Sequence, residues 1–307
     1  MKNERQEISA PYAGQAKSSN PGRNFAVMAI LLLLAFSVPL YQLARFAVAS
    51  DLYSYILLIP FISGYLVWLQ RSKLSACFRP VWLPAVVFFL GGLSALAWFW
   101  MACHAGCRLS EDDRLALMMT AFVLFFAGGF CWFLGKEMVR TLAFPLGLLV
   151  FLVPMPTFML VGIEWFLQQG SALAAEGFFQ LSGATFFRDG LIFKLPTISL
   201  MVAPECSGIH STMVLFITSS VAGYLFLRSP WRRSIFVLAV IPLALLRNGF
   251  RVYVIGELCT HLGPGMVDSP IHHHGGPLFF ALSLIPFFLL LFLLRRSERS
   301  RMDSKSQ

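Results

Sequence analysis

The residues that could do chemistry gather in three short blocks, and the first is VAPECSGIHS, residues 202–211. Cys206 lies between an acidic residue and a Ser-Gly pair, directly before a long apolar run. A cysteine at a helix N-terminus meets unpaired backbone N–H groups and the positive end of the helix dipole, which favour the nucleophilic thiolate. Ser207 and Gly208 leave access to the sulfur and to backbone donors for an oxyanion. A membrane cysteine is also commonly a small core filler, so this block alone leaves both interpretations open.

The second block is RNGFR, residues 247–251. Arg251 follows Arg233 by 18 residues, about 27 Å along a helix, which predicts a position near the far boundary of a membrane. Arg247 lies one turn deeper, and Asn248 lies three residues before Arg251 on nearly the same face. An arginine at membrane depth is costly and indicates a functional site. Snorkelling to lipid headgroups explains Arg251 tolerably, but explains Arg247 and Asn248 poorly.

The third block is SPIHHHGGPLFF, residues 269–280. Histidine exchanges protons near neutral pH, and the glycines that follow would allow close approach of another backbone. Because adjacent residues of a helix point in different directions, at most one or two of His272, His273 and His274 can serve one centre. A surface cluster and a metal site are the alternatives, although zinc sites usually need ligands on one face, such as i and i+4.

The composition predicts that a membrane positions these blocks. The 307 residues are 57% hydrophobic and 13% charged, with a mean hydropathy of +0.72, which one soluble core cannot accommodate. The net charge of +9 comes from short Lys and Arg clusters between apolar runs, a pattern that orients helices and does not indicate nucleic acid binding. Eight runs are long enough to cross a bilayer, the first as an uncleaved helix. They cover residues 25–44, 53–69, 82–102, 115–134, 141–157, 207–227, 234–258 and 277–295.

The loop charges predict the orientation of these runs, because Lys and Arg prefer the cytoplasmic side. The basic clusters at 2–23, 71–79, 136–140, 228–233 and 295–301 all fall on one side of such a topology. We therefore expect a multi-pass protein of the cell (inner) membrane with both termini cytoplasmic and the active site extracytoplasmic. The expected domains are a disordered cytoplasmic tail over 1–24, one membrane-embedded domain over 25–296, and a basic cytoplasmic tail over 297–307.

Residues 158–206 interrupt the pattern of spans. Glu164, Gln168, Gln169 and Glu176 interrupt an otherwise apolar helical sequence, and counting it as a span would reverse every later loop. An amphipathic helix on the outer surface fits better. The alternating residues around RDG then predict a short hairpin, which delivers Cys206 to the first turn of the sixth membrane helix. The predicted fold class is thus an all-α polytopic membrane protein.

This topology brings Cys206, Arg251 and His272–His274 to one outer level on three different helices. A thiol nucleophile, a fixed cation and a proton shuttle suit acyl transfer, without a cofactor or a metal. A transporter is one rival interpretation, but it would distribute polar residues across the bilayer. A metal-dependent membrane hydrolase using His104, His261 and the His cluster is another.

The blocks CSGIHS, RNGFR and HHHGGPLFF resemble the three motif blocks of the exosortase/archaeosortase family. Their order, their spacing and the preceding FFRDGLIFKLP segment are similar as well, so the resemblance covers the C-terminal half. It implies a membrane cysteine protease or transpeptidase that acts on exported proteins ending in a short motif, a membrane helix and a basic tail. An amine acceptor such as a lipid or glycan carrier would complete transpeptidation, and water would complete proteolysis.

The resemblance also implies roles for individual residues. Cys206 would be the nucleophile, Arg251 the stabiliser of the transition state and His272 the acid and base. His272 is preferred because Gly276 and Phe280 follow it in a His-x-x-x-Gly-x-x-x-Phe pattern, with His273 and His274 as alternatives. The sequence departs from the family at His210, where the family commonly has Arg. Gly208 and Gly249 could line a lateral entrance for the substrate helix, although ordinary helix packing explains these glycines equally.

The other cysteines are expected to be structural. Cys103 and Cys107 could pair outside the membrane, although an i, i+4 spacing in a helix would strain the bond, or they could remain unpaired. Cys259 is also predicted on the outer side, and Cys77 and Cys131 on the inner side or within a span.

Overall fold

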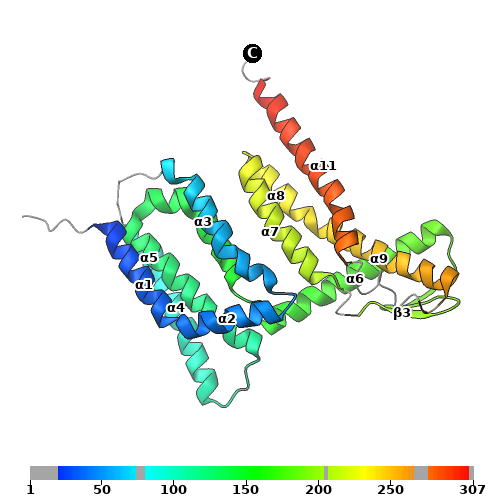
Figure 1. The fold of residues 1–307 in the computed structure, drawn as a ribbon, viewed down its shortest axis with the longest axis horizontal. Coiled ribbons are helices and arrows are strands. Elements are labelled where there is room, and N and C mark those ends of the chain that lie inside the picture. The colour runs from blue at the N-terminus through cyan, green and yellow to red at the C-terminus, as the bar shows by residue number, and fades with distance from the viewer. Residues whose placement is uncertain (1–19, 74–79, 204–206, 264, 266–275, 304–307) are drawn as a thin grey trace, which may run out of the picture.

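The computed structural model describes residues 20–73, 80–203, 207–263, 265 and 276–303 (Figure 1). Its helices are α1 (Pro21–Ala35), α2 (Ser37–Ala49), α3 (Ile59–Leu69), α4 (Trp82–His104), α5 (Glu111–Leu148), α6 (Thr157–Ser182), α7 (Ile209–Phe226), α8 (Pro230–Leu238), α9 (Val240–Leu262) and α11 (Gly276–Asp303). Short 3-10 segments are η1 (Ser54–Leu58), η2 (Arg71–Lys73) and η3 (Leu149–Leu152). The strands are β1 (Phe187–Asp189), β2 (Ile192–Lys194) and β3 (Ser199–Met201).

Length and hydropathy confirm the all-α polytopic membrane class. Five of the described helices are long and apolar enough to cross a membrane, or six if α1 and α2 count as one span bent by 66°. The predicted run 53–69 is a shorter apolar helix, Ser54–Leu69, so a count of eight spans is not confirmed by this test. Large apolar side chains such as Leu34 and Phe61 are exposed on the outer faces of the helices, as expected where lipid replaces water.

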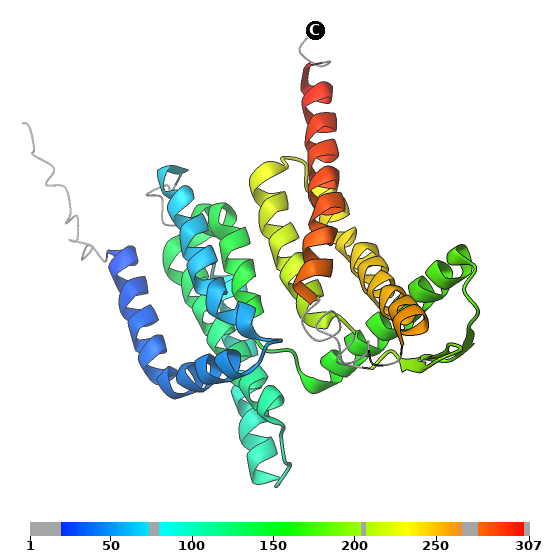
Figure 2. The same cartoon turned by 45° about the vertical axis from the view of Figure 1, so that its right-hand side comes forward.

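Gly135 divides α5 and explains why the sequence predicted separate runs over 115–134 and 141–157. Its φ of +80° is in the left-handed region, which glycine adopts without the penalty of a Cβ. Figure 2 shows the two parts of α5 side by side. The second part packs against α3, where the Ser63 hydroxyl donates a 2.8 Å hydrogen bond to the Pro145 carbonyl.

The segment between the two halves of the chain forms a helix and a hairpin at the predicted places in the sequence. α6 is not among the candidate spans, and it runs across the ends of the neighbouring helices (Figure 1). β1 and β2 pair antiparallel through a turn at Gly190, where φ is +61°. β3 adds a third antiparallel strand that the sequence analysis did not predict.

Close packing between α6 and α9 decides the role of two small residues. A Cβ on Gly249 would lie 2.5 Å from the Ala174 Cβ, and one on Gly256 would lie 2.6 Å from the Phe179 ring. These glycines therefore let α9 approach α6, as small residues do in membrane helix pairs. The suggestion that Gly249 lines an entrance is wrong, because α6 fills the space beside it.

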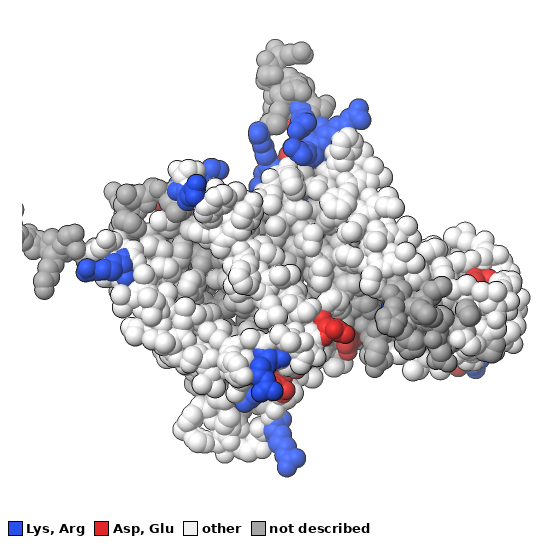
Figure 3. All heavy atoms as spheres, in the orientation of Figure 1, with Lys and Arg blue, Asp and Glu red and all other residues white. Residues whose placement is uncertain are grey.

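The charged residues border a broad uncharged band (Figure 3). The end of α3, the turn between α7 and α8 and the end of α11 lie together at one end of the molecule (Figure 1). The basic segments 71–73, 228–233 and 295–299 therefore share that end, as the sequence predicted. The loop between α4 and α5 at the opposite end is mixed in charge, with Arg108 and Arg114 beside three acidic residues.

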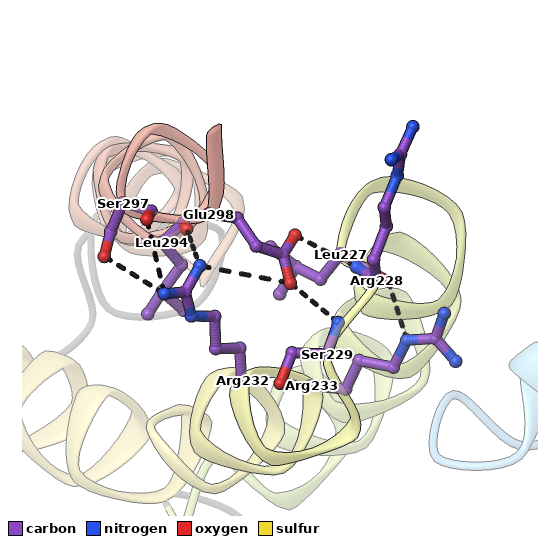
Figure 4. Close-up of polar contacts among 8 residues, drawn as sticks. All are labelled: Leu227, Arg228, Ser229, Arg232, Arg233, Leu294, Ser297 and Glu298. Atoms are coloured by element: carbon purple, nitrogen blue, oxygen red, sulfur yellow. Dashed lines mark hydrogen bonds and ion pairs between the residues drawn. The ribbon is translucent and has the colours of Figure 1, made fainter. Parts of the chain in front are cut away.

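A polar cluster at the basic end holds α11 against the turn between α7 and α8 (Figure 4). The Glu298 carboxylate accepts hydrogen bonds from the backbone N–H groups of Arg228, at 3.0 Å, and of Ser229, at 2.6 Å. Arg232 lies 4.0 Å from the same carboxylate and donates to carbonyls at the end of α11. A carboxylate at the N-terminus of α8 is also favoured by the helix dipole. We call these four residues the Glu298 clamp.

Candidate functional site

A cavity of about 700 Å³ lies beside the starts of α7 and α11 and the middle of α9. Its volume is within the usual range for a ligand site, and its wall is mixed in polarity. The lining comes from the loop between α2 and η1, and from α6, α7, α9 and α11. It comprises Ser50, Asp51, Leu52, Glu164, Gly208, Ile209, His210, Ser211, Val214, Arg251, Gly276, Pro277 and Phe280.

Residues from all three sequence blocks line this cavity. Gly208 and its neighbours come from the first block, Arg251 from the second, and Gly276 and Phe280 from the third. The blocks are far apart in the sequence, so the fold brings them together. Cys206 and the histidines at 272–274 lie outside the described residues.

Gly208 determines how the first block enters α7. It is the N-cap of α7 with a φ of +72°, whereas N-cap residues are normally extended. Its carbonyl accepts hydrogen bonds from the Thr212 backbone and hydroxyl, at 3.0 and 2.8 Å, and from the Ser211 hydroxyl at 3.0 Å. The described helix begins at Ile209, two residues after the predicted start of this run at Ser207.

Arg247 and Asn248 support the cavity from behind instead of lining it. Arg247 is 9% exposed, and its Nη2 donates to the Gly208 carbonyl at 3.4 Å. The Asn248 amide donates to the Ser171 hydroxyl of α6 at 3.0 Å. Snorkelling is therefore excluded for Arg247, since its guanidinium is buried against α7. The pair connects α9 to both α7 and α6, and so sets the spacing of the elements that line the cavity.

The described residues on both sides of 204–206 are anchored. The Gln168 side chain donates to the Val202 carbonyl at 3.0 Å, which ties the end of the strand segment to α6. On the other side, Ser207 is 1% exposed and Gly208 is held by Arg247. Of the predicted supporting residues, Gly208 thus lines the cavity, and Ser207, its neighbour in the sequence, is buried.

Replacing Gly208 tests this contact, and Gly183 provides a matched control. Both glycines have a φ of +72°, but a Cβ at Gly183 meets open space, whereas one at Gly208 would lie 3.1 Å from Arg247 Nη2. We expect Gly183→Ala to lower the free energy of unfolding by about 1–2 kcal/mol from backbone strain alone. Gly208→Ala should lower it further and displace Arg247. Thermal unfolding in detergent measures both variants, and equal shifts would contradict a structural role for the contact.

Several cavity residues were not predicted as site residues. Ser50, Asp51 and Leu52 form a wall from the N-terminal half, between the predicted runs 25–44 and 53–69. The His210 Nδ1 lies 3.5 Å from the Leu52 carbonyl, so the residue that departs from the family pattern contacts this wall. The sequence signal that could have indicated this wall is the short polar segment at Ser50 and Asp51, between two apolar runs. Glu164 had been noted only as an interruption of an apolar helix.

Hydrogen bonds fix this N-terminal wall to the neighbouring loops. The buried Tyr53 hydroxyl donates a hydrogen bond to the Asp112 carboxylate at 3.2 Å and lies 3.3 Å from the Met155 carbonyl. Burial, together with the Asp112 carboxylate, raises the pKa of Tyr53 well above its usual value. The phenol therefore stays protonated at any physiological pH and remains a donor. The Asp113 carboxylate accepts from the Thr157 backbone at 2.7 Å, which joins α5 to the start of α6.

The remaining cysteines and histidines do not form a second centre in the described part of the chain. Cys103 and Cys107 are exposed free thiols, and Cys131 and Cys259 are buried free thiols. His261 pairs with Glu257 at 3.2 Å, and His104 packs on Trp100. Among the described residues, no group of three or more His, Cys, Asp or Glu could hold a metal ion.

Comparison with known proteins gives one finding. The model of the transmembrane exosortase family (Exosortase_EpsH) matches residues 47–289, which is most of the chain and includes all three blocks. No curated protein and no solved structure gives a significant match.

Proposed function

The chain belongs to the transmembrane exosortase family, and on this premise we propose that it is an integral-membrane cysteine transpeptidase or endopeptidase. It cleaves the C-terminal sorting signals of exported proteins near the outer boundary of the membrane. The observation that carries the proposal is the convergence of Gly208, Arg251 and Gly276, one residue from each block, on a single cavity.

The charge distribution supports an orientation for this activity. The basic ends of α3, α8 and α11 face the cytoplasm, as Lys and Arg prefer. The cavity lies at the other end of α7 and of α11, so it faces the extracytoplasmic boundary. A peptide bond just outside a membrane helix would reach this level, because the helix itself remains in the bilayer.

The proposed reaction has two steps. The Cys206 thiolate attacks the carbonyl carbon of the scissile bond, and a C–S bond forms while Arg251 and backbone N–H groups stabilise the oxyanion. His272, or else His273, protonates the departing amine as the C–N bond breaks, and the tail helix leaves. The exported protein remains as a thioacyl enzyme. An amine acceptor then receives the acyl group in transpeptidation, or water receives it in hydrolysis.

Arg247 and Asn248 act in this proposal as positioning residues. They lie behind the cavity and contact Gly208 and Ser171, which belong to two other elements of the site. A displacement of about 1 Å at a reacting group can cost on the order of a hundredfold in rate. The buried contacts therefore support catalysis without touching the substrate.

The test is processing of exported proteins that end in a short motif, a membrane helix and a basic tail. Each is expressed in a host lacking other exosortases, with and without this chain, and its intact mass is measured. We expect loss of the helix and tail only when this chain is present. The mass of the new C-terminus separates hydrolysis from transfer to an amine. Unchanged masses for a broad panel of such substrates would refute the proposed activity.

A further inference from the structure

A second, smaller hollow lies beside the cavity, between η1 and α3 on one side and α7 on the other. Its volume is about 380 Å³, and its wall is largely apolar. His210 and Val214 line both this hollow and the cavity, so the two spaces adjoin along α7. Its other lining residues are Ser54, Tyr55, Leu57, Leu58, Ile59, Ile62, Ile217 and Thr218. We call this hollow the α3–α7 groove.

The α3–α7 groove runs along one face of α7. His210, Val214, Ile217 and Thr218 are spaced as i, i+4, i+7 and i+8, which is one stripe of an α-helix. Eight residues separate the first from the last, so the stripe extends about 12 Å inward from the cavity. Leu58 is 59% exposed and Thr218 is also exposed, so the groove is open along its side. In a membrane that side faces lipid.

The groove ends before the basic end of the molecule. There the Gln70 amide donates to the Tyr224 hydroxyl, and the Tyr224 ring stacks on Phe144 with centroids 4.1 Å apart. The Arg233 guanidinium also lies over the Tyr224 ring, 5.1 Å from the ring centroid. These contacts join α3, α5 and α7 beyond Thr218, which is the last residue of α7 that lines the groove, and so close its inner end.

We propose that the α3–α7 groove binds the outer turns of the membrane helix of the sorting signal. The proposal rests on the proposed function, in which a peptide bond is held in the cavity. The chain that follows this bond must leave the cavity toward the membrane, and the groove is a described apolar path in that direction. On the α9 side, α6 fills the space beside Gly249.

The position of the groove beside the cavity decides which occupant we propose. An apolar helix and a lipid acyl chain both match the lining, but the substrate helix is covalently joined to the residues in the cavity. Its effective concentration at the groove is therefore high whenever the cavity is occupied. Because the inner end is closed, the enzyme contacts roughly the first eight residues of the helix, and the rest of the helix lies in lipid.

Photo-crosslinking tests the occupant directly. A photoreactive residue replaces Thr218, and the substrate is trapped on the Cys206→Ala variant. The matched control replaces Ile285 of α11, which is 66% exposed and, like Thr218, lies nine residues after the start of its helix. We expect substrate adducts from Thr218 to exceed those from Ile285 by about tenfold and to map to the outer turns of the substrate helix. Equal yields, or adducts to lipid alone, would overturn the proposal.

Filling the groove gives a second, functional readout. Thr218→Trp should lower processing by about tenfold or more, because a bulky ring in a packed contact displaces the helix, while Ile285→Trp should leave it unchanged. Membrane levels of both variants are measured alongside. If wild type processes its substrate and Thr218→Trp does so equally well, the groove assignment alone fails. If wild type processes no substrate, the proposed function and the groove fail together.

Discussion

Replacing Cys206 by alanine is expected to abolish the shortened product, and Cys206→Ser to reduce its formation by on the order of 10³-fold or more. The proposed reaction passes through a thioacyl enzyme, and neither variant can form that intermediate. Cleavage of a co-expressed substrate is followed by intact mass over time. The wild-type enzyme, quenched with hydroxylamine, should release the trapped acyl group, and the variants should release none.

Cys107→Ala is the control for this experiment. Cys107 is an exposed free thiol in the loop between α4 and α5, away from the residues that line the cavity. It should process substrate at the wild-type rate, which separates nucleophilic catalysis from a general need for thiols. Persistent processing of a demonstrated substrate by Cys206→Ala would remove the nucleophile assignment and favour a metal-dependent hydrolase.

Arg251→Lys is expected to lower the processing rate by about 10²–10³-fold, the loss typical for one oxyanion donor. Lysine retains the positive charge but lacks the planar fork that can donate two hydrogen bonds to one group. Arg251 lines the cavity but not the α3–α7 groove, so the substrate helix should still bind in the groove. Crosslinking at Thr218 should therefore persist while turnover falls. Single-turnover kinetics on a substrate shown to be processed separate these two effects.

Arg108→Lys provides the matched control for Arg251. It makes the same substitution on an exposed arginine outside the cavity, in the loop between α4 and α5. We expect its rate to equal that of wild type. A rate for Arg251→Lys within threefold of wild type would contradict a role in the transition state, since even one weak hydrogen bond contributes more (about 1 kcal/mol).

The amino-acid sequence predicts the membrane class, because hydropathy is a property of the residues themselves. It also predicts that the three blocks meet, because the order of apolar runs and charged loops places them at one level. It predicts the outer helix and the hairpin as well, since Glu164 and the RDG turn break an apolar pattern. The 66° bend between α1 and α2 was not predicted, although Pro39 marks it: proline cannot donate a hydrogen bond to the carbonyl four residues earlier, which is that of Ala35, the last residue of α1. The wall formed by Ser50, Asp51 and Leu52 depends on tertiary packing of the N-terminal half.

The blocks also illustrate which roles depend on the fold. Arg247 and Arg251 are equally basic and four residues apart, yet Arg251 lines the cavity and Arg247 is buried behind it. The spacing of four residues places both arginines on one side of a helix. It does not show which neighbouring element packs over each of them. The contact between Arg247 and the Gly208 carbonyl required α7 and α9 to be placed relative to each other. The roles of Cys206 and His272 stay predictions.

The Glu298 clamp has a consequence for the order in which the chain is made. A ribosome delivers α7, α8 and α9 before α11, so Arg228, Ser229 and Arg232 are in place before their carboxylate partner is synthesised. The same last helix carries Gly276 and Phe280 of the cavity wall. A nascent chain therefore has no complete cavity, and assembly of the site coincides with insertion of α11.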